Sequence, residues 1–411
     1  MANVSSSNGL EKRPKLRFPG FDEPWNESKL SACFAKNIKK NTDGRISNVI
    51  CNSAKMGLIP QRDYFDKDIA NSDNTSGYYI IEHNDFVYNP RKSSDAPYGP
   101  ISRYACPDAG IVSPLYLCFR AKGDVDTNFF EWYFRSFAWH RYIYMTGDSG
   151  ARHDRVSIKD DDFFSMPIRF PSSIEQKKIA SFLSAIERRI SFQQLLVDSL
   201  KKYKRGVMQK VFRNMSAFSP SGFETVRLSD IFKKASRRNS NGEIKNVITN
   251  SAEHGLIPQR DFFDKDIAVD GNTGNYYVIE YGDFVYNPRK SNTAPYGPFN
   301  RYERQEKGII SPLYTCLVLK TDIEPAYLAW YFKSDAWYRY IYDNGSQGVR
   351  HDRVSMTDDL LMGIPVIIPS KDSQIKIAKL LDCLEKRFQV ELSQCEYLKT
   401  VREALLQQLF I

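Results

Sequence analysis

Hydrophobic residues follow two kinds of pattern along the chain, and the first predicts short strands. β-Branched and aromatic runs are bounded by Asn, Asp, Gly and Pro, which is the pattern of a mixed sheet. The clearest runs are Ser76–Glu82, Asp85–Tyr88, Ile111–Val112 and Leu115–Phe119. A helix is expected next, with Asp126 or Thr127 as its N-cap and its body running through about Tyr144. We expect its aromatic stripe to pack in the core: Phe130, Tyr133, Phe134, Phe137 and Tyr144.

The second pattern predicts two long amphipathic helices. From Ser173 to about Phe212, apolar residues recur by threes and fours, and the stretch contains no proline. About 40 residues would make a helix on the order of 60 Å long. A similar helix is expected from Ser370 to the end. The first seam consists of Leu183, Ile186, Ile190, Val197, Leu200, Val207 and Val211, with polar Gln193 and Lys204. The second consists of Leu381, Leu384, Phe388, Cys395, Leu398, Leu405 and Leu409, with polar Glu391 and Arg402.

From Lys29 onward the chain repeats itself at a constant shift. Residues 59–63 return as 257–261, residues 86–93 as 284–291, and residues 152–157 as 350–355, so the shift is 257 − 59 = 198. A repeat of this length is a whole domain rather than a short solenoid module. Two copies of one surface on one chain suggest a two-fold symmetric partner, and duplex DNA has such symmetry.

A single helix cannot bury an apolar stripe alone, so we expect the two long helices to pack as an antiparallel pair. That arrangement would place the two globular domains at opposite ends, related by a pseudo-two-fold axis. Exposed helices that await a partner are an alternative that does not exclude this pairing, since Leu196, Tyr203 and Leu406 widen the seam. We therefore predict an α+β fold with a first domain at 1–171, a helical spacer at 172–212, a second domain at 213–369 and a C-terminal helical spacer at 370–411.

Composition narrows the class of protein. The 411 residues are 42% hydrophobic and 13% aromatic, which suits packed domains, and the charge of 58 − 49 = +9 fits a polyanionic partner. Seven cysteines form no C-x-x-C pair and no zinc-spaced cluster, which is typical of reduced thiols. Residues 1–16 lack the apolar run of a signal peptide, and no stretch is long and apolar enough to span a membrane. We expect a soluble cytoplasmic protein.

Enzyme signatures are missing. The sequence contains no G-x-S-x-G, H-E-x-x-H, P-loop or G-x-G-x-x-G motif. Asn89-Pro90-Arg91 and its repeat only faintly resemble the Asn-Pro-Pro-aromatic motif of amino-methyltransferases, because the second proline and the aromatic residue are absent. Acidic residues between Asp63 and Asp68 are more typical of a surface loop than of a metal nuclease. We expect neither a catalytic nor a metal site.

Three basic loops occur in both halves and are suited to DNA. Gln and Arg in the first can pair with adenine and guanine edges, although a turn with an Arg–Asp pair explains it equally well. The second is a rigid Pro-rich loop with Arg, Lys and Tyr. The third is a Gly-led loop whose arginines can hold phosphates, with a structural ion pair as the alternative. The predicted DNA-binding residues are Gln61, Arg62, Arg91, Lys92, Tyr98, Arg103, Arg152, His153 and Arg155, with Gln259, Arg260, Arg289, Lys290, Tyr296, Arg301, Arg350, His351 and Arg353 in the second half.

This layout resembles the specificity (S) subunit of type I restriction-modification enzymes over essentially the whole chain. Its best local signatures are Ile174–Ala180 and Gln374–Ala378 at the helix starts, with Val207–Phe212 and Leu405–Phe410 at the helix ends. The resemblance implies two target-recognition domains that each read half of a split DNA site. It also implies that the chain itself is not catalytic and has no cofactor. Methyltransferase subunits, with two expected, and a restriction subunit would dock on it and use S-adenosylmethionine, ATP and Mg²⁺.

The two halves match at every predicted reading loop, whereas members of this family often carry unlike domains. Antiparallel domains would then read inverted, near-palindromic half-sites about one helical turn or more apart. The halves differ at Lys55-Met56 against Glu253-His254, Ser94-Asp95 against Asn292-Thr293, and Asp148-Ser149 against Ser346-Gln347, so one altered base remains possible. Two other classes stay open: a stand-alone DNA-binding protein without enzyme partners, and a scaffold that does not contact DNA.

Overall fold

The computed structural model describes residues 13–64, 75–148, 154–261, 273–347 and 352–411. The chain divides into two compact units, and the elements of the first recur in the same order in the second, which has a few further short elements. Unit 1 comprises Met1–Gln194 together with Ser393–Ile411, and unit 2 comprises Leu195–Leu392. Each unit therefore combines one globular domain with a stretch of each long helix.

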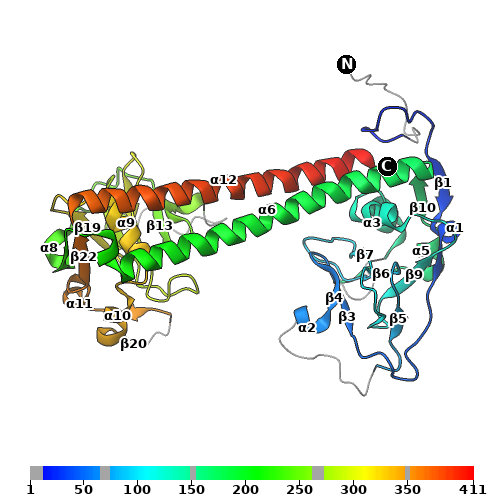
Figure 1. Cartoon of the computed structure of the whole chain (residues 1–411), viewed down its shortest axis with the longest axis horizontal. Helices are drawn as coiled ribbons and strands as arrows, with labels where there is room; N and C mark the ends of the chain where they lie inside the picture. Colours follow the sequence, from blue (N-terminus) through cyan, green and yellow to red (C-terminus); the bar gives the residue numbers. More distant parts are fainter. Residues whose placement is uncertain (1–12, 65–74, 149–153, 262–272, 348–351) are drawn as a thin grey trace. The chain divides into compact units, whose positions relative to one another are not determined.

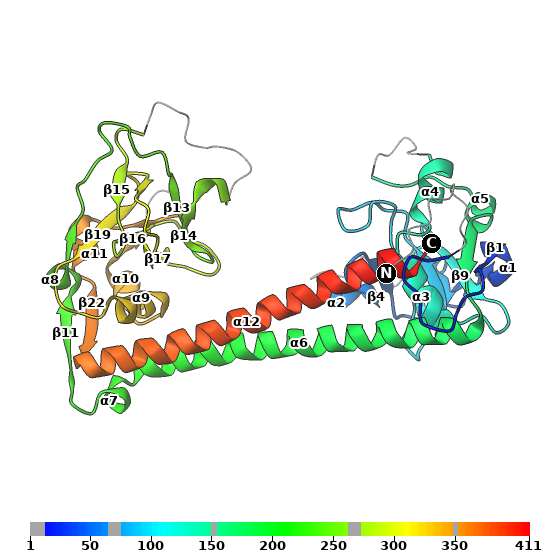
Figure 2. The same ribbon diagram turned by 90° about the horizontal axis from the view of Figure 1, so that it is seen from above.

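The first globular domain is built from short strands and helices (Figures 1 and 2). Its elements are β1 (Asn26–Lys29), α1 (Leu30–Cys33), β2 (Phe34–Lys36), β3 (Ile50–Ser53), β4 (Gly57–Pro60), α2 (Gln61–Tyr64), β5 (Tyr79–Ile81), β6 (Phe86–Tyr88), β7 (Ile101–Arg103), β8 (Gly110–Val112), β9 (Leu117–Ala121), α3 (Thr127–Arg135), α4 (His140–Thr146), α5 (Asp160–Phe164) and β10 (Pro167–Phe170).

The second globular domain repeats this series. Its elements are β11 (Phe223–Arg227), α8 (Leu228–Ile231), β12 (Phe232–Lys234), β13 (Ile248–Ser251), β14 (Gly255–Pro258), the 3₁₀ turn η2 (Gln259–Asp261), β15 (Tyr277–Ile279), β16 (Phe284–Tyr286), β17 (Phe299–Arg301), β18 (Gly308–Ile310), β19 (Thr315–Leu319), α9 (Pro325–Lys333), α10 (Tyr338–Asn344), β20 (Ser346–Gln347), β21 (Val354–Ser355), α11 (Asp358–Met362) and β22 (Pro365–Pro369). The short helix α7 (Met215–Phe218) precedes it.

Each domain is centred on a four-stranded sheet, in the order β2-β9-β6-β7 in the first and β12-β19-β16-β17 in the second. The hairpins β3-β4 and β13-β14 and the pairs β5-β8 and β15-β18 lie outside these sheets. All pairings between the named strands of the described residues are antiparallel. Parallel pairing is confined there to the isolated bridges Val49–Ile111 and Val247–Ile309, so the mixed character that we predicted is slight.

The predicted aromatic helix begins where expected but is interrupted. Asp126 caps α3 by accepting hydrogen bonds from the backbone N–H groups of Asn128 and Phe129. The prediction of one helix through Tyr144 was wrong, because α3 ends at Arg135 and α4 starts at His140. The buried Ser136 hydroxyl donates to the Tyr133 carbonyl at 2.6 Å, which competes with helical hydrogen bonding. After this break Phe137 and Tyr144 are exposed, so the prediction that they pack in the core was wrong.

Two long helices, α6 (Ser173–Arg213) and α12 (Lys371–Leu409), confirm the predicted amphipathic segments. They run antiparallel within each unit. In unit 1, Arg402 lies 2.9 Å from Glu187, and the Cys395 thiol contacts Gln194 at 3.4 Å, so residue numbers rise along one helix as they fall along the other. In unit 2, Lys204 pairs with Glu385 at 2.5 Å. The predicted polar seam positions therefore face the other helix, where they pair across it or are buried.

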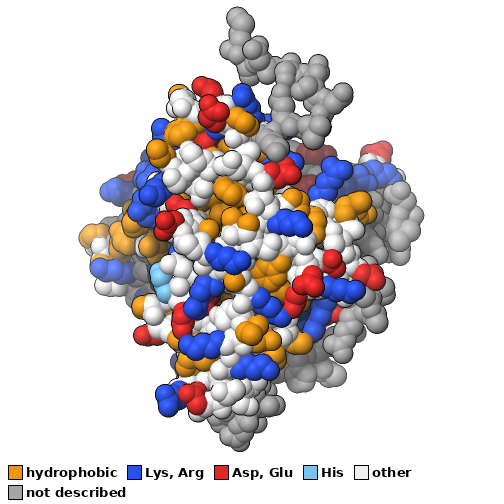
Figure 3. Space-filling model, turned by 90° about the vertical axis from the view of Figure 1, so that its right-hand side faces the viewer, with side chains coloured by type: hydrophobic (Ala, Val, Ile, Leu, Met, Phe, Trp, Pro, Cys, Tyr) orange, Lys and Arg blue, Asp and Glu red, His pale blue; other side chains and the backbone are white. Residues whose placement is uncertain are grey.

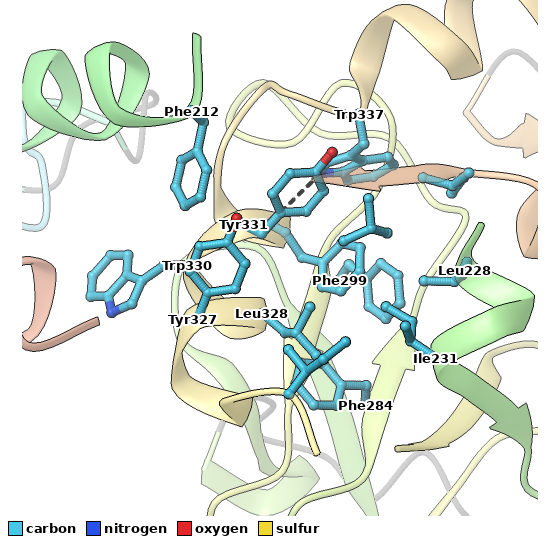
Figure 4. Packing of buried hydrophobic residues seen from close by; sticks show 14 of the residues in the cluster. Phe212, Leu228, Ile231, Phe284, Phe299, Tyr327, Leu328, Trp330, Tyr331 and Trp337 are labelled. Atoms are coloured by element: carbon cyan, nitrogen blue, oxygen red, sulfur yellow. Dashed lines mark hydrogen bonds between the residues drawn. The ribbon is translucent and has the colours of Figure 1, made fainter. Parts of the chain in front are cut away.

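Aromatic residues dominate both cores and attach each domain to the helices. In unit 2, Phe212 at the end of α6 packs against the rings of Tyr327 and Tyr331 on α9, with centroids 5.8 and 5.5 Å away (Figure 4). Its repeat partner Phe410, just beyond α12, packs in the same way on Phe129 and Tyr133 of unit 1, at 5.5 and 6.1 Å. Burying such a side chain typically contributes about 1.5–3 kcal/mol, so these rings anchor the helix ends.

Candidate nucleic-acid interface

The Pro-rich loop that joins β6 to β7 is closed on itself. The Asn89 backbone N–H donates to the Pro100 carbonyl at 3.0 Å, and Gly99 adopts a left-handed φ of +82°. A Cβ atom at Gly99 would lie 2.1 Å from the Asn89 carbonyl oxygen, so only glycine fits there. Gly297 is equally confined, with φ +85° and a Cβ position 2.0 Å from the Asn287 carbonyl oxygen. Both loops are therefore held in one conformation by their own backbone.

This loop lies beside the end of the third predicted loop, the Gly-led loop that ends at Arg155. Lys92 N–H donates to the Asp154 carbonyl at 2.8 Å, and Val156 N–H donates to the Pro90 carbonyl at 2.9 Å. The two bonds place Arg91 opposite Arg155 as an antiparallel bridge. Arg289 and Arg353 form the same bridge in the second domain. The Pro-rich loop and the described end of the third loop thus form one continuous wall in each domain.

A buried asparagine connects this wall to the β3-β4 hairpin. The Asn52 side-chain amide donates to the Val87 carbonyl at 2.8 Å, and the Asn89 side chain donates to the Asn52 carbonyl at 3.0 Å. Ser102 donates to the Asn52 side-chain oxygen at 2.7 Å. Asn250 makes the equivalent bonds to Val285 and Asn287. Our sequence reasoning missed Asn52, although its recurrence as Asn250 in the second half was a signal that could have identified it.

Between the wall and the hairpin lies a groove of about 650 Å³ in the first domain. We call it the basic groove. Its lining comes from four stretches of chain: Cys51–Met56, Asn89–Ser93 with Asp95 and Pro100, Ser113 with Leu115–Tyr116, and Arg155. Burial raises the pKa of the Tyr116 phenol, so this side chain remains a protonated hydrogen-bond donor at neutral pH. The groove therefore offers cationic, hydroxyl and amide groups to a polar ligand.

The charges on the wall are only partly neutralised within the protein. One Asp154 carboxylate oxygen lies 3.9 Å from the Nε atoms of both Arg91 and Arg155, beyond hydrogen-bond distance. The buried Nε atoms of Arg155 and of Arg353 have no hydrogen-bond partner among the described residues. Arg91 is 69% exposed, so its guanidinium is presented to solvent. Over the face drawn in Figure 3, basic side chains are otherwise interspersed with acidic ones.

Several predicted residues lie elsewhere. Arg103 donates to Glu131 at 2.7 Å and to Asn84 at 2.6 Å and is mostly buried, so it stabilises the domain. Arg301 is mostly buried too and lies 5.3 Å above the Tyr281 ring. Tyr98 and Tyr296 are partly buried and pack on the helices behind the loop, against His140 and Tyr338 respectively, with ring centroids 5.0 Å apart. These four residues are therefore not included in the surface that we propose below.

The first predicted loop lies directly after the hairpin. Gln61 N–H donates to the Val49 carbonyl at 2.8 Å, and Gln259 N–H donates to the Val247 carbonyl at the same distance, so both glutamines are fixed at a turn. Arg62 and Arg260 follow with exposed side chains. The predicted residues Arg152, His153, Arg350 and His351 lie outside the described residues. Lys92 and Lys290 lie on the walls next to the bridged arginines.

Two other properties bear on the kind of site. Within the described ranges, no group of three or more His, Cys, Asp or Glu side chains is arranged to hold a metal ion. None of the described helices is both long and apolar enough to cross a membrane. The lining of the basic groove itself supplies hydrogen-bonding and charged groups.

Comparison with solved structures identifies the fold. The HsdS subunit from Thermoanaerobacter tengcongensis matches with a TM-score of 0.52 and 17% identity, covering 98% of this chain and 99% of that one. The type I restriction-modification S subunit from M. genitalium matches with a TM-score of 0.52 and 15% identity over 97% and 99%. A chain from a structure of complex assembly and conformational transition in the type I R-M system gives 0.60 and 16% over 96% and 99%. No family model matches the sequence, and no curated protein matches it. The chain thus has the fold of type I S subunits.

Proposed function

We propose that this chain is the DNA-recognition subunit of a type I restriction-modification complex. The observation that carries the proposal is the duplicated wall in which Arg91 bridges Arg155 and Arg289 bridges Arg353, on a fold shared with S subunits over nearly the full length. Paired arginines beside a polar groove suit both phosphate oxygens and guanine edges. The chain itself would be non-catalytic.

Each globular domain would read one half of a split site, and the paired helices would set the distance between the halves. The proposed reading surface consists of the basic groove with Gln61 and Arg62, and its counterpart with Gln259 and Arg260. The boundaries at 171, 212 and 369 stay a prediction for the extent of these functional parts. Because residues 89–93 of the wall recur unchanged as 287–291, the two half-sites are expected to be nearly the same and inverted.

The paired helices supply the surface for partner subunits in this proposal. Large apolar side chains remain exposed on them, Phe192 and Tyr397 in unit 1 and Leu195, Tyr203 and Val390 in unit 2. Exposed apolar residues gathered on a helical face favour a protein partner over solvent. Two methyltransferase subunits would dock here and bring S-adenosylmethionine, and a restriction subunit would bring ATP and Mg²⁺. A cytoplasmic location stays a prediction.

The direct test is selection of random DNA duplexes by the purified full chain, followed by salt-dependent binding to the enriched sequence. We expect a split motif and an affinity that falls steeply with salt. Arg91→Ala and Arg289→Ala should each weaken binding by about 1–3 kcal/mol if they contact bases. Arg45→Ala is a matched control, because Arg45 is highly exposed and does not line the groove. Binding without sequence preference or salt dependence would rule the proposal out.

The alternative is a DNA-binding protein that acts alone. It would give the same selected motif, so co-purification with the methyltransferase subunit must separate the two. Under our proposal, charged substitutions at Phe192 or Tyr203 should abolish that co-purification and leave the DNA motif unchanged. A wild-type chain that binds the motif but retains no methyltransferase subunit would favour the solitary function.

A further inference from the structure

The groove in the first domain and the corresponding residues of the second differ at only one corner. Most of the lining is identical between the halves, including Asn52, the Asn89–Ser93 wall, Tyr116 and Arg155. The lining residues that differ are Cys51, Lys55, Met56 and Asp95, which correspond to Thr249, Glu253, His254 and Thr293. We call these positions the variable corner. Any difference in what the two grooves bind must arise largely from it.

Two of these positions, Lys55 and Asp95, lie far apart in the sequence but meet in space. Lys55 is in the turn of the β3-β4 hairpin and Asp95 is in the Pro-rich loop, and their charged groups are 3.5 Å apart. The ion pair cannot form in the second domain, where Thr293 replaces the aspartate. The change at one position is thus matched by a change at its neighbour, as expected for residues that act together.

The backbone under the variable corner is the same in both domains. Ser53 Oγ accepts hydrogen bonds from Lys55 and Met56 N–H at 3.3 Å, and Ser251 Oγ accepts from the equivalent N–H groups at 3.2 Å. In the Pro-rich loop, Ser93 and Ser291 hold the N–H groups of Ala96 and Ala294 at 3.1 Å. The substitutions therefore change the chemical groups presented and leave their positions unchanged.

The third sequence difference between the halves is of another kind. Asp148 exchanges two backbone hydrogen bonds of 2.8 Å with Ser157, and Ser346 pairs with Ser355 at the same place in the second domain. Asp148 does not line the basic groove. This leaves the variable corner as the one place where the described groove lining changes its chemistry.

We propose that the variable corner makes the two half-sites differ at one base pair, an inference that rests on the function proposed above. The Lys55 ammonium, oriented by Asp95, is a donor that suits the O6 and N7 acceptors of guanine. The Glu253 carboxylate is an acceptor that suits the amino group of cytosine. The first domain therefore takes a guanine where the second takes a cytosine, and the identical walls read the remaining positions alike.

Exchange of the corner residues tests this assignment. The variant C51T/K55E/M56H/D95T gives the first domain the corner of the second, and T249C/E253K/H254M/T293D does the reverse. Each purified full chain, with wild type in parallel, selects from a library of random duplexes. We expect one base pair in one half-site to change, with its preference altered by roughly 5- to 150-fold. R45E is the matched control, since Arg45 corresponds to Glu243 and lies outside the groove, and it should leave the motif unchanged.

The first exchange should also make the selected site fully self-complementary. The inference is overturned if wild type selects a split motif that neither exchange alters, or if each exchange alters several positions. It is equally overturned if both exchanged chains, folded by circular dichroism, bind DNA without any preference, because the corner would then support the whole groove. A wild-type chain that enriches no split motif would instead contradict the proposed function itself.

Discussion

The basic groove and the core beneath it have diverged to different extents between the two halves. Residues 89–93 recur unchanged as 287–291, whereas the core replaces Ile101, Phe119 and Phe163 by Phe299, Leu317 and Leu361. Exposed loops usually vary more than packed interiors, because a close-packed core resists changes of volume. Here the order is reversed, because residues 89–93 of the wall recur unchanged while the core changes and only has to remain filled.

The core remains filled because an aromatic ring has changed strands. In the first domain Phe119 on β9 stacks on Phe86 with centroids 5.5 Å apart. In the second domain Leu317 takes that place on β19, and Phe299 on β17 stacks on Phe332 at 3.9 Å. Hydrophobic exchanges that conserve total volume are tolerated best in cores. The two domains thus fill the same part of the core with an aromatic ring from different strands.

A buried carboxylate has changed partners in the same way. Asp85 is held by Arg120 through two hydrogen bonds of 2.6 and 2.7 Å. The equivalent Asp283 pairs instead with Arg237, which corresponds to Lys39, while Val318 stands in place of Arg120. Each arginine also pairs with the nearby Glu82 or Glu280 at 2.8 Å. The scaffold needs a cation at this aspartate but accepts it either from β9 or from the segment that follows β12.

The largest loss of stability is expected at Gly99, the position in the wall where only glycine fits. Gly99→Ala should destabilise the first domain by about 4 kcal/mol or prevent folding, because the new methyl group meets the Asn89 carbonyl and the backbone has positive φ. Urea unfolding measures the loss. Gly123→Ala is the control, since Gly123 has φ +56° but nothing within 4 Å of the new atom, and it should cost about 1 kcal/mol. Equal costs for the two variants would mean that the loop is not rigid.

The next largest loss of stability is expected for Arg120→Val. This variant tests whether the buried Asp85 carboxylate can exchange one cationic partner for another. Arg120→Val should cost about 2–3 kcal/mol, because the fully buried Asp85 carboxylate loses its cation, although Arg120 itself is half-exposed. Adding Lys39→Arg imports the arrangement of the second domain and should recover at least half of that stability. A double-mutant cycle in urea unfolding measures the coupling. Independent effects of the two substitutions would refute the exchange of partners.

A pH effect should distinguish the two domains. Burial among aromatic rings lowers the pKa of His140 to about 4, whereas Tyr338 occupies this position in the second domain. As the pH falls from about 6.5 to 4, the unfolded chain takes up a proton that the folded domain resists, so stability is lost. We expect His140→Tyr to remove about 2 kcal/mol of this pH dependence. Unfolding at pH 7 and pH 4 compares the variant with wild type, and parallel curves would contradict the assignment.

The features that could be predicted from the sequence are those that depend on a local residue pattern or on the internal repeat. The long helices, the Asp126 cap and the duplicated elements follow from spacing along the chain, and the structure confirms them. The break after Arg135 was missed because the aromatic period continues across it, and only the contact of the Ser136 hydroxyl with Tyr133 marks the end. A helical pattern alone does not reveal such competition for backbone carbonyls.

The arrangement of the wall was predicted in part, and its role in binding stays a prediction. The Pro-rich loop and the end of the third loop were chosen for their basic residues, and they do lie together. Arg103 and Arg301 were chosen for the same reason, yet Glu131 and Tyr281 come from distant segments that composition cannot associate with them. Asn52 was overlooked because its recurrence as Asn250 lies outside the basic loops from which the candidates were chosen. Residue type indicates which chemistry is possible, and the tertiary fold decides which side chains remain free to use it.

The smallest effect concerns the exchanged ring in the core. Phe119→Leu should cost about 1 kcal/mol, because leucine fills less of the site between Phe86 and Phe163. Ile101→Phe alone should also destabilise, since the added ring overfills a packed core. Together they import the arrangement of the second domain, so the double variant should be more stable than the sum of the single changes predicts. Urea unfolding of the four chains measures this coupling, with Leu117→Thr, another change toward the second domain, as the control outside that contact. Strict additivity would show that the two cores are not alternative packings of one scaffold.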